Sequence, residues 1–376
     1  MKTELCERFG IEYPIFVFTP SEKVAAAVTR AGGMGVLGCV RFNDADDLEN
    51  VLQWMDENTD GKPYGVDIVM PAKIPTEGTA VDINKLIPQS HRDFVDKTLA
   101  DLGVPPLPDE GDRNEGVLGW LHSVARSHVE VALKHPIKLI ANALGSPPKD
   151  VVDQVHEAGV PVAALAGSAK HAQRHAENGV DIVVAQGHEA GGHTGEIGSM
   201  VLWPEVVDGL RASGHDTPVL AAGGIGTGRQ VAAALALGAS GVWMGSAFLT
   251  SAEYDLGHRR ESGVSTIQEA MLRATSGDTV RRRIYTGKPA RLLKTKWTEA
   301  WDATDAPEPL PMPLQNILVS EAHQRMNESD NPDTVAMPVG QIVGRMNEIR
   351  PVADIIAELV SGFEEASKRL DGIRDN

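Results

Sequence analysis

Eight short apolar segments, all before residue 245, constrain the fold more than any other feature of the chain. Each has the length of a strand, ends near Gly, Pro or a small residue, and lacks the strict alternation of a half-exposed strand. Continuous apolar runs of this kind are typical of parallel strands buried on both faces. The predicted strands are residues 14–18, 35–38, 64–70, 137–141, 160–165, 181–185, 218–222 and 241–244.

Helix-like segments separate several of these strands, and two stretches repeat one pattern. Residues 160–187 and 217–247 each contain a Pro-Val strand, a Gly turn, an Ala-rich helix, a second Gly, a strand and a final Gly. Repeated strand–helix–strand units predict a parallel sheet with right-handed crossovers. Eight strands favour an α/β fold of the (β/α)8 TIM barrel type, with a doubly wound open sheet as the alternative. The predicted helices, each followed by a Gly suited to a helix C-terminus, are residues 21–31, 167–178 and 228–237.

Two regions do not follow this alternation of strands and helices. Residues 71–136 separate the third and fourth strands by more than a usual connection, which predicts an insertion after the third strand with a helix near residues 117–134. Residues 251–376 predict a C-terminal extension, mostly helical, packed on the barrel of residues 1–250. The last helix is amphipathic from residue 352 onward. Its apolar face could cover the barrel or a second subunit, so a homo-oligomer stays open.

The charge balance of the chain argues against two classes of partner. The 376 residues carry a formal net charge of −17, so we expect neither nucleic acid nor an anionic membrane to be the main partner. Residues 231–252 hold no charge, but Gly and Ser interrupt them, which favours a short helix and a buried strand over a membrane span. Cys6 and Cys39 show no metal-binding spacing, and the first residues contain no apolar targeting segment. We therefore expect a cytoplasmic protein.

Residues 185–195, AQGHEAGGHTG, resemble the H-E-x-x-H motif of zinc hydrolases but contain one residue too many. On a helix, His188 and His193 would diverge by about 140°, because each residue turns the helix by roughly 100°. Gly191 and Gly192 also disfavour a helix. The spacing therefore predicts no metal site.

The same segment suits a flat ligand better. It follows a predicted strand, and the carboxyl ends of barrel strands form the active-site face. Its glycines let the backbone approach a ligand closely, and His193 can then project from a tight loop toward that ligand. The alternative for His193 is a hydrogen bond within the loop, whereas His188 is more easily read as facing solvent. Glu189 could either orient the loop or lie exposed.

Two glycine-rich turns follow the seventh and eighth predicted strands. Residues 221–230, AAGGIGTGRQ, are not a dinucleotide fingerprint, because Arg229 stands where the third Gly is needed. TIM barrels frequently bind phosphate with the loops after strands seven and eight. Together with His193, one phosphate site predicts a mononucleotide cofactor with a flat ring. The expected phosphate ligands are Gly223, Gly224, Gly245 and Ser246.

The motifs QGHEAGGHTG and PVLAAGGIGTGRQVAAALALGASGVWMGSAF resemble the nitronate monooxygenase family, formerly called 2-nitropropane dioxygenases. The resemblance runs from YPIF near the start through GSAF, and YTGKPARLLK resembles the family segment beyond the barrel. It implies a TIM barrel that binds FMN non-covalently and without a metal. Related flavin barrels include enoyl-acyl-carrier-protein reductases and NADH:quinone reductases.

The resemblance also implies roles for individual residues. His193 matches the active-site histidine of the A-G-G-H motif, and Gln186 matches a position beside the flavin ring. Asp67 stands where the family usually has Asn, and an ionised Asp can only accept hydrogen bonds. The first strand, PIFVFTP, also departs from the usual Met- and Gly-containing ending. The expected cofactor-binding residues are Phe18, Thr19, Asp67, Gln186, Gly191, Gly192, Gly223, Gly224, Gly245 and Ser246.

The implied reaction is the oxidation of nitronates or nitroalkanes with O2 to a carbonyl compound and nitrite. His193 would bind the anionic nitro group when protonated, or remove the α-proton of a nitroalkane when neutral. An NAD(P)H-dependent reductase of quinones or unsaturated acyl thioesters is the alternative, with residues 71–136 helping to hold a larger substrate. A non-enzymatic flavoprotein or structural barrel is the third possibility. Lys288 and Arg291 could border the pocket.

Overall fold

The computed structural model describes residues 1–70, 86–107 and 122–374. Eight parallel strands form a closed barrel, in which β1 pairs with both β2 and β9. This closure confirms the predicted TIM barrel and excludes the open sheet. In barrel order the strands are β1 (Ile15–Thr19), β2 (Met34–Gly38), β3 (Gly65–Asp67), β4 (Leu139–Asn142), β5 (Val162–Ala166), β6 (Ile182–Gln186), β8 (Val219–Ala222) and β9 (Gly241–Met244).

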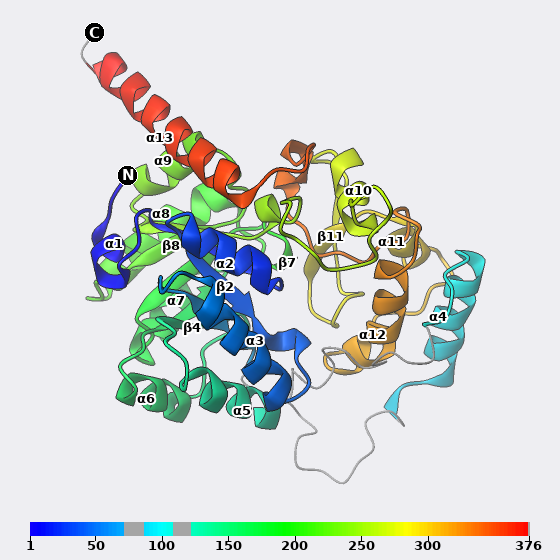
Figure 1. The fold of residues 1–376 in the computed structure, drawn as a ribbon. Helices are drawn as coiled ribbons and strands as arrows, with labels where there is room; N and C mark the ends of the chain where they lie inside the picture. Colours follow the sequence, from blue (N-terminus) through cyan, green and yellow to red (C-terminus); the bar gives the residue numbers. More distant parts are fainter. Residues whose placement is uncertain (71–85, 108–121, 375–376) are drawn as a thin grey trace.

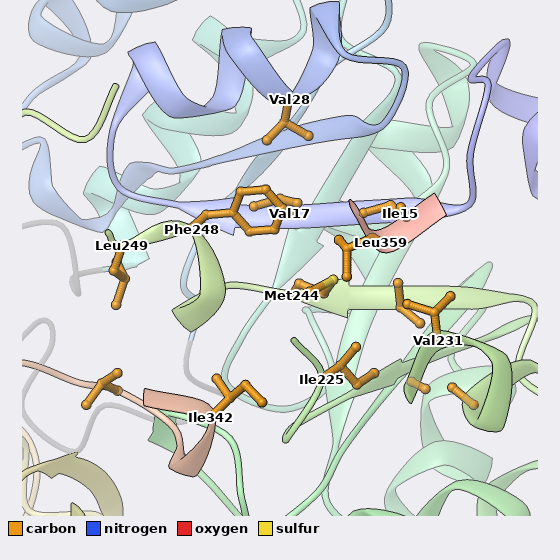
Figure 2. Packing of buried hydrophobic residues seen from close by; sticks show 14 of the residues in the cluster. Ile15, Val17, Val28, Ile225, Val231, Met244, Phe248, Leu249, Ile342 and Leu359 are labelled. Atoms are coloured by element: carbon orange, nitrogen blue, oxygen red, sulfur yellow. The ribbon is translucent and has the colours of Figure 1, made fainter. Parts of the chain in front are cut away.

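The strands lack polar alternation because both of their faces are buried. In β1, Phe16 points into the barrel, where its ring meets the edge of Phe9 at 5.6 Å, while Ile15 and Val17 face the surrounding helices. Figure 2 shows Ile15 and Val17 packed near Met244 in this outer core. The short helix α1 (Glu4–Phe9) contributes Phe9 and so closes the amino end of the barrel.

The outer helices begin where side chains cap them. Ser21, Ser168 and Thr227 each accept a hydrogen bond from a backbone N–H in the first turn of the following helix. These caps fit the predicted helix starts to within two residues. The barrel helices are α2 (Glu22–Arg30), α3 (Ala45–Asn58), α5 (His122–Ala132), α6 (Lys149–Glu157), α7 (Ala169–Glu177), α8 (Ser199–Ala212) and α9 (Gly228–Ala236), and short helical turns are η1 (Cys39–Arg41) and η4 (Ser246–Phe248).

The two described helices of the predicted insertion after the third strand pack against different parts of the protein. Its second described helix, α5, packs against α3, as expected of a barrel helix. Its first helix, α4 (Gln89–Asp101), instead packs on the C-terminal extension, where Val95 and Leu99 join Trp297 and Trp301 in one apolar cluster. Figure 1 shows α4 beside α12, away from the barrel helices. The rest of the predicted insertion, including the start of the helix expected at residues 117–134, lies outside the described residues.

The C-terminal extension contains strands as well as helices. A three-stranded antiparallel sheet joins β10 and β11 to β7 (Gly192–His193), which belongs to the loop after β6. The extension is therefore hydrogen-bonded directly to the predicted active-site loop. Its elements are α10 (Thr266–Arg273), β10 (Thr279–Arg282), β11 (Ala290–Leu293), α11 (Lys296–Ala300), α12 (Leu314–Asn327), η5 (Gln341–Arg345) and α13 (Val352–Arg374).

The last helix, α13, packs on the barrel through its first half. Val352, Ile356 and Leu359 are buried, and the helix lies across α9 and touches α2. Leu359 is seen beside Val231 of α9 in Figure 2. The described helices include none that is long and apolar enough to cross a membrane.

The contact between α13 and α9 gives a test of this packing. A side chain on Gly228, at the start of α9, would overlap the backbone of Leu359 and Phe363. We expect Gly228→Ala to lower the free energy of unfolding by about 1–3 kcal/mol, because an overpacked helix contact forces the backbones apart. Gly372→Ala, at a position of α13 where a Cβ meets nothing within 4 Å, is the matched control. Urea denaturation showing equal stability for Gly228→Ala and the unaltered protein would contradict the contact.

Candidate active site

A cavity of about 650 Å³ opens at the carboxyl ends of the barrel strands. Thr19 is not among the residues that line it; this side chain is buried at the start of α2, where its hydroxyl accepts a hydrogen bond from the Ser21 N–H at 3.1 Å. All the other sequence-predicted site residues border the cavity. They are Phe18, Asp67, Gln186, Gly191, Gly192, His193, Gly223, Gly224, Gly245 and Ser246.

The loop after β6 is anchored at both ends. Glu189 accepts hydrogen bonds from the Ser199 N–H at 2.9 Å and from the Ser199 hydroxyl at 2.8 Å, so it ties the loop to the start of α8. This resolves its two sequence-based interpretations in favour of orienting the loop. Gly191 lies so close to the chain at Val339 and Gly340 that a Cβ would be 2.8 Å from their backbone atoms. The absence of a side chain at Gly191 therefore allows the C-terminal extension to pack directly on this loop.

His193 is held by the extension. Its backbone pairs with Ala290 of β11, and its ring Nε2 lies 2.6 Å from the Thr286 hydroxyl. Loss of solvent around the ring, helped by the positive charge of Lys288, lowers the pKa of His193 to about 4. The imidazole is consequently neutral near pH 7 and can act as a base or a neutral hydrogen-bond donor.

His188 has a different environment from His193. Its Nδ1 lies 3.3 Å from the Gly195 carbonyl, and its own carbonyl accepts from the Arg291 guanidinium at 3.0 Å. Arg291 therefore supports the loop from behind. Throughout the described ranges, no group of three or more His, Cys, Asp or Glu side chains is placed to hold a metal ion.

The two glycine-rich turns border the cavity. Gly223 and Gly224 adopt φ angles of 100° and 74°, which an L side chain would strain. The Gln230 side chain fixes this turn by bonding to the Gly224 carbonyl at 2.5 Å and the Gly226 N–H at 3.0 Å. In the second turn, the Ser246 hydroxyl accepts from the Gly340 N–H at 2.9 Å, which leaves its own proton for a ligand. Backbone and hydroxyl donors grouped in this way suit a phosphate.

Asp67 ends β3 on the far side of the cavity from these turns. Its side chain is only 1% exposed, and neither carboxylate oxygen has a hydrogen-bond partner among the residues that the structure describes. Burial raises the pKa of this carboxyl to about 7. A buried polar group with no protein partner inside a ligand cavity is suited to a polar edge of the ligand.

Sequence reasoning missed the residues that the C-terminal extension adds to the cavity. Tyr285 and His323 stack at 4.8 Å, and burial lowers the pKa of His323 to about 3. Polar residues at helical spacing on α12 continue this wall, a signal that the sequence did contain at residues 316–327. The lining residues of α12 are Asn316, Ser320, His323, Gln324 and Asn327.

Comparisons with known proteins agree with this geometry. The sequence model of the nitronate monooxygenase family matches residues 2–362. A Mycobacterium tuberculosis protein named "Putative monooxygenase" is 46% identical, with 99% of each chain covered. A Staphylococcus aureus protein named "Probable nitronate monooxygenase" is 25% identical, covering 97% of this chain and 98% of its own.

Solved structures show the same similarity in three dimensions. Nitroalkane oxidase from Streptomyces ansochromogenes superposes with a TM-score of 0.77 at 25% identity, over 97% of this chain and 99% of that one. FabK from Thermotoga maritima gives a TM-score of 0.74 at 26% identity, over 99% of both chains. From the family match and the 46% identical relative, the chain belongs to the nitronate monooxygenase family and is a flavin-dependent oxidoreductase.

Proposed function

We propose that this protein is an FMN-dependent nitronate monooxygenase, which oxidises nitronates and nitroalkanes with O2 to a carbonyl compound and nitrite. The observation that carries the proposal is the position of His193, held by Thr286 at 2.6 Å in the wall of the cavity that also contains both glycine-rich turns. A histidine base beside a phosphate-suited cradle fits a small substrate whose α-proton must be removed.

The donor set of the cavity supports FMN as the flavin. Gly224 and Ser246 offer one grouped set of donors for one phosphate, and the unpartnered Asp67 offers a polar contact for the ring at the other side. A dinucleotide would need a second phosphate site, and the G-x-G-x-x-G spacing that would supply it is broken at Arg229. When bound, the flavin supplies the electron-accepting chemistry, and the protein supplies position and proton transfer.

The contact between His193 and Thr286 is compatible with a role of the histidine as a base. In the tautomer whose Nε2–H donates to the Thr286 hydroxyl, Nδ1 carries the basic lone pair. A neutral imidazole can then take the α-proton of a nitroalkane, whereas a nitronate has already lost that proton. The lowered pKa therefore favours the role as a base over the binding of an anion by a charged imidazolium.

Replacement of the histidine tests this role. We expect His193→Asn to bind flavin but to lose about 10²–10⁴-fold in kcat/KM with a neutral nitroalkane, because general base catalysis contributes an effect of this size. The loss with a preformed nitronate should be smaller, because no proton has to be removed. Steady-state oxygen consumption with both substrate forms measures the difference. Unaltered turnover of the nitroalkane by His193→Asn would refute the assignment.

The pH dependence gives a second test. His193 is neutral above its pKa of about 4, so nitroalkane kcat/KM should fall only as the pH approaches 4, well below the ordinary histidine value of about 6.5. Lys288→Met should move this acid limb to higher pH, since the cation that disfavours the imidazolium is gone. Lys134→Met, at another exposed lysine of the protein, is the control and should leave the limb in place. A limb near pH 6.5 in all three proteins would contradict the proposed environment.

The cavity wall on α12 favours one alternative function. The polar side chains at residues 316–327 extend the cavity beyond His193, giving room for a substrate larger than a nitroalkane, and FabK is among the similar structures. The alternative is an NAD(P)H-dependent reductase of quinones or unsaturated acyl thioesters. Mixing the purified protein anaerobically with NADH, NADPH or a nitronate distinguishes the two. Bleaching of flavin absorbance by the nitronate alone is expected, and rapid bleaching by a pyridine nucleotide would favour the reductase.

A further inference from the structure

Asp67 is a buried carboxyl in the cavity wall whose oxygens have no hydrogen-bond partner among the described residues. In barrel order β3 stands four strands away from β8, so Asp67 faces the glycine-rich turns across the barrel mouth. The nearest amide does not serve it: Asn142, at the end of the neighbouring β4, bonds to the N–H and carbonyl of Met70 at 2.9 and 3.2 Å. Both carboxylate oxygens are therefore buried in the cavity wall without a hydrogen-bond partner among the described residues.

The charged groups around this part of the cavity are already paired. Arg41, which follows β2, forms an ion pair with Glu22 at 2.5 Å. Asp255, on the opposite wall, pairs with Lys23 at 2.7 Å and accepts from the Ser21 hydroxyl at 2.8 Å.

The titratable groups closest to the carboxyl are neutral. Cys39 is a buried thiol whose pKa is raised, chiefly by burial and then by Asp67 itself. Behind it, Tyr64 donates to Asp56 at 2.6 Å and is also neutral at ordinary pH, because burial and Asp56 raise its pKa. His193, across the cavity, is uncharged near pH 7. Among the residues that the structure describes, no cation offsets a negative charge at Asp67, so burial is the cause that raises the pKa of its carboxyl and favours the protonated acid.

A protonated carboxyl has one donor and one acceptor side by side, which is also the pattern of an Asn amide. The pyrimidine part of a flavin ring carries the complementary imide, with an N–H beside carbonyl oxygens. We propose that protonated Asp67 binds this imide edge, with its O–H donating to a ring carbonyl and its C=O accepting from the ring N–H. The inference rests on the flavin assignment under the proposed function, and it extends that assignment by requiring a proton for the ring contact.

This pairing couples flavin binding to proton uptake. An ionised Asp67 keeps only acceptors, so it loses the donated bond and places a negative charge against a carbonyl oxygen. Below pH 7 the carboxyl is already protonated, and FMN binds at full affinity. Above pH 7 the protein must take up one proton for each flavin bound, so the dissociation constant should rise up to tenfold for each pH unit.

The test is a titration of the full-length protein, freed of flavin, with FMN between pH 6.5 and 9, followed by quenching of flavin fluorescence. The matched variant is Asp67→Asn, which keeps the size and the donor–acceptor pair but cannot ionise. We expect the dissociation constant of the unaltered protein to rise about tenfold per unit above pH 7, and that of Asp67→Asn to stay nearly constant. A flat profile in the unaltered protein, or the same rise in both proteins, would overturn the inference.

Calorimetry in buffers of different ionisation enthalpy gives an independent readout that does not depend on the variant. Near pH 8 the unaltered protein should take up close to one proton per FMN, and near pH 6.5 clearly fewer. No proton uptake at pH 8 would overturn the pairing while leaving the FMN assignment intact. Failure of the unaltered protein to bind FMN at any pH would instead remove the flavin assignment on which the pairing rests.

Discussion

The pairing of β7 with β11 is the interaction on which the site depends. It joins the loop after β6 to a strand almost a hundred residues later in the chain. The contact between the His193 ring and Thr286, 93 positions apart, lies beside it. The pairing turns a glycine-rich loop into the edge of a small sheet, removes water from around the imidazole and brings α12 over the cavity.

The barrel itself could be predicted because its signals are local. Residues such as Ile15, Phe16 and Val17 form an unbroken apolar run since one face packs inside the barrel and the other against helices. The caps at Ser21 and Thr227 are equally local, because each satisfies N–H groups within its own first turn. The shared location of the glycine-rich turns and the loop of His193 could then also be predicted, because a closed barrel brings the carboxyl ends of its strands to one face.

The rest of the site could not be predicted, because its signals are long-range. Nothing in YTGKPAR shows that Thr286 meets His193, and the short strands β10 and β11 look like ordinary polar segments in the sequence. The sequence alone suggests that Asp67 is an ionised acceptor, whereas burial in the folded chain raises the pKa of its carboxyl to about 7. Thr19 shows that a residue's position in a family motif does not by itself predict a cofactor contact. It ends a strand at the correct face of the barrel, but its hydroxyl accepts a hydrogen bond from the Ser21 N–H and does not line the cavity.

The distance along the chain between His193 and its partners also gives the site an order of assembly. The barrel strands end at Met244, so the barrel is complete in sequence before Thr286, β11 and α12 are reached. During synthesis the loop that carries His193 is therefore made before the segment that encloses it. The burial of this one side chain therefore depends on contacts with the part of the molecule that is made last.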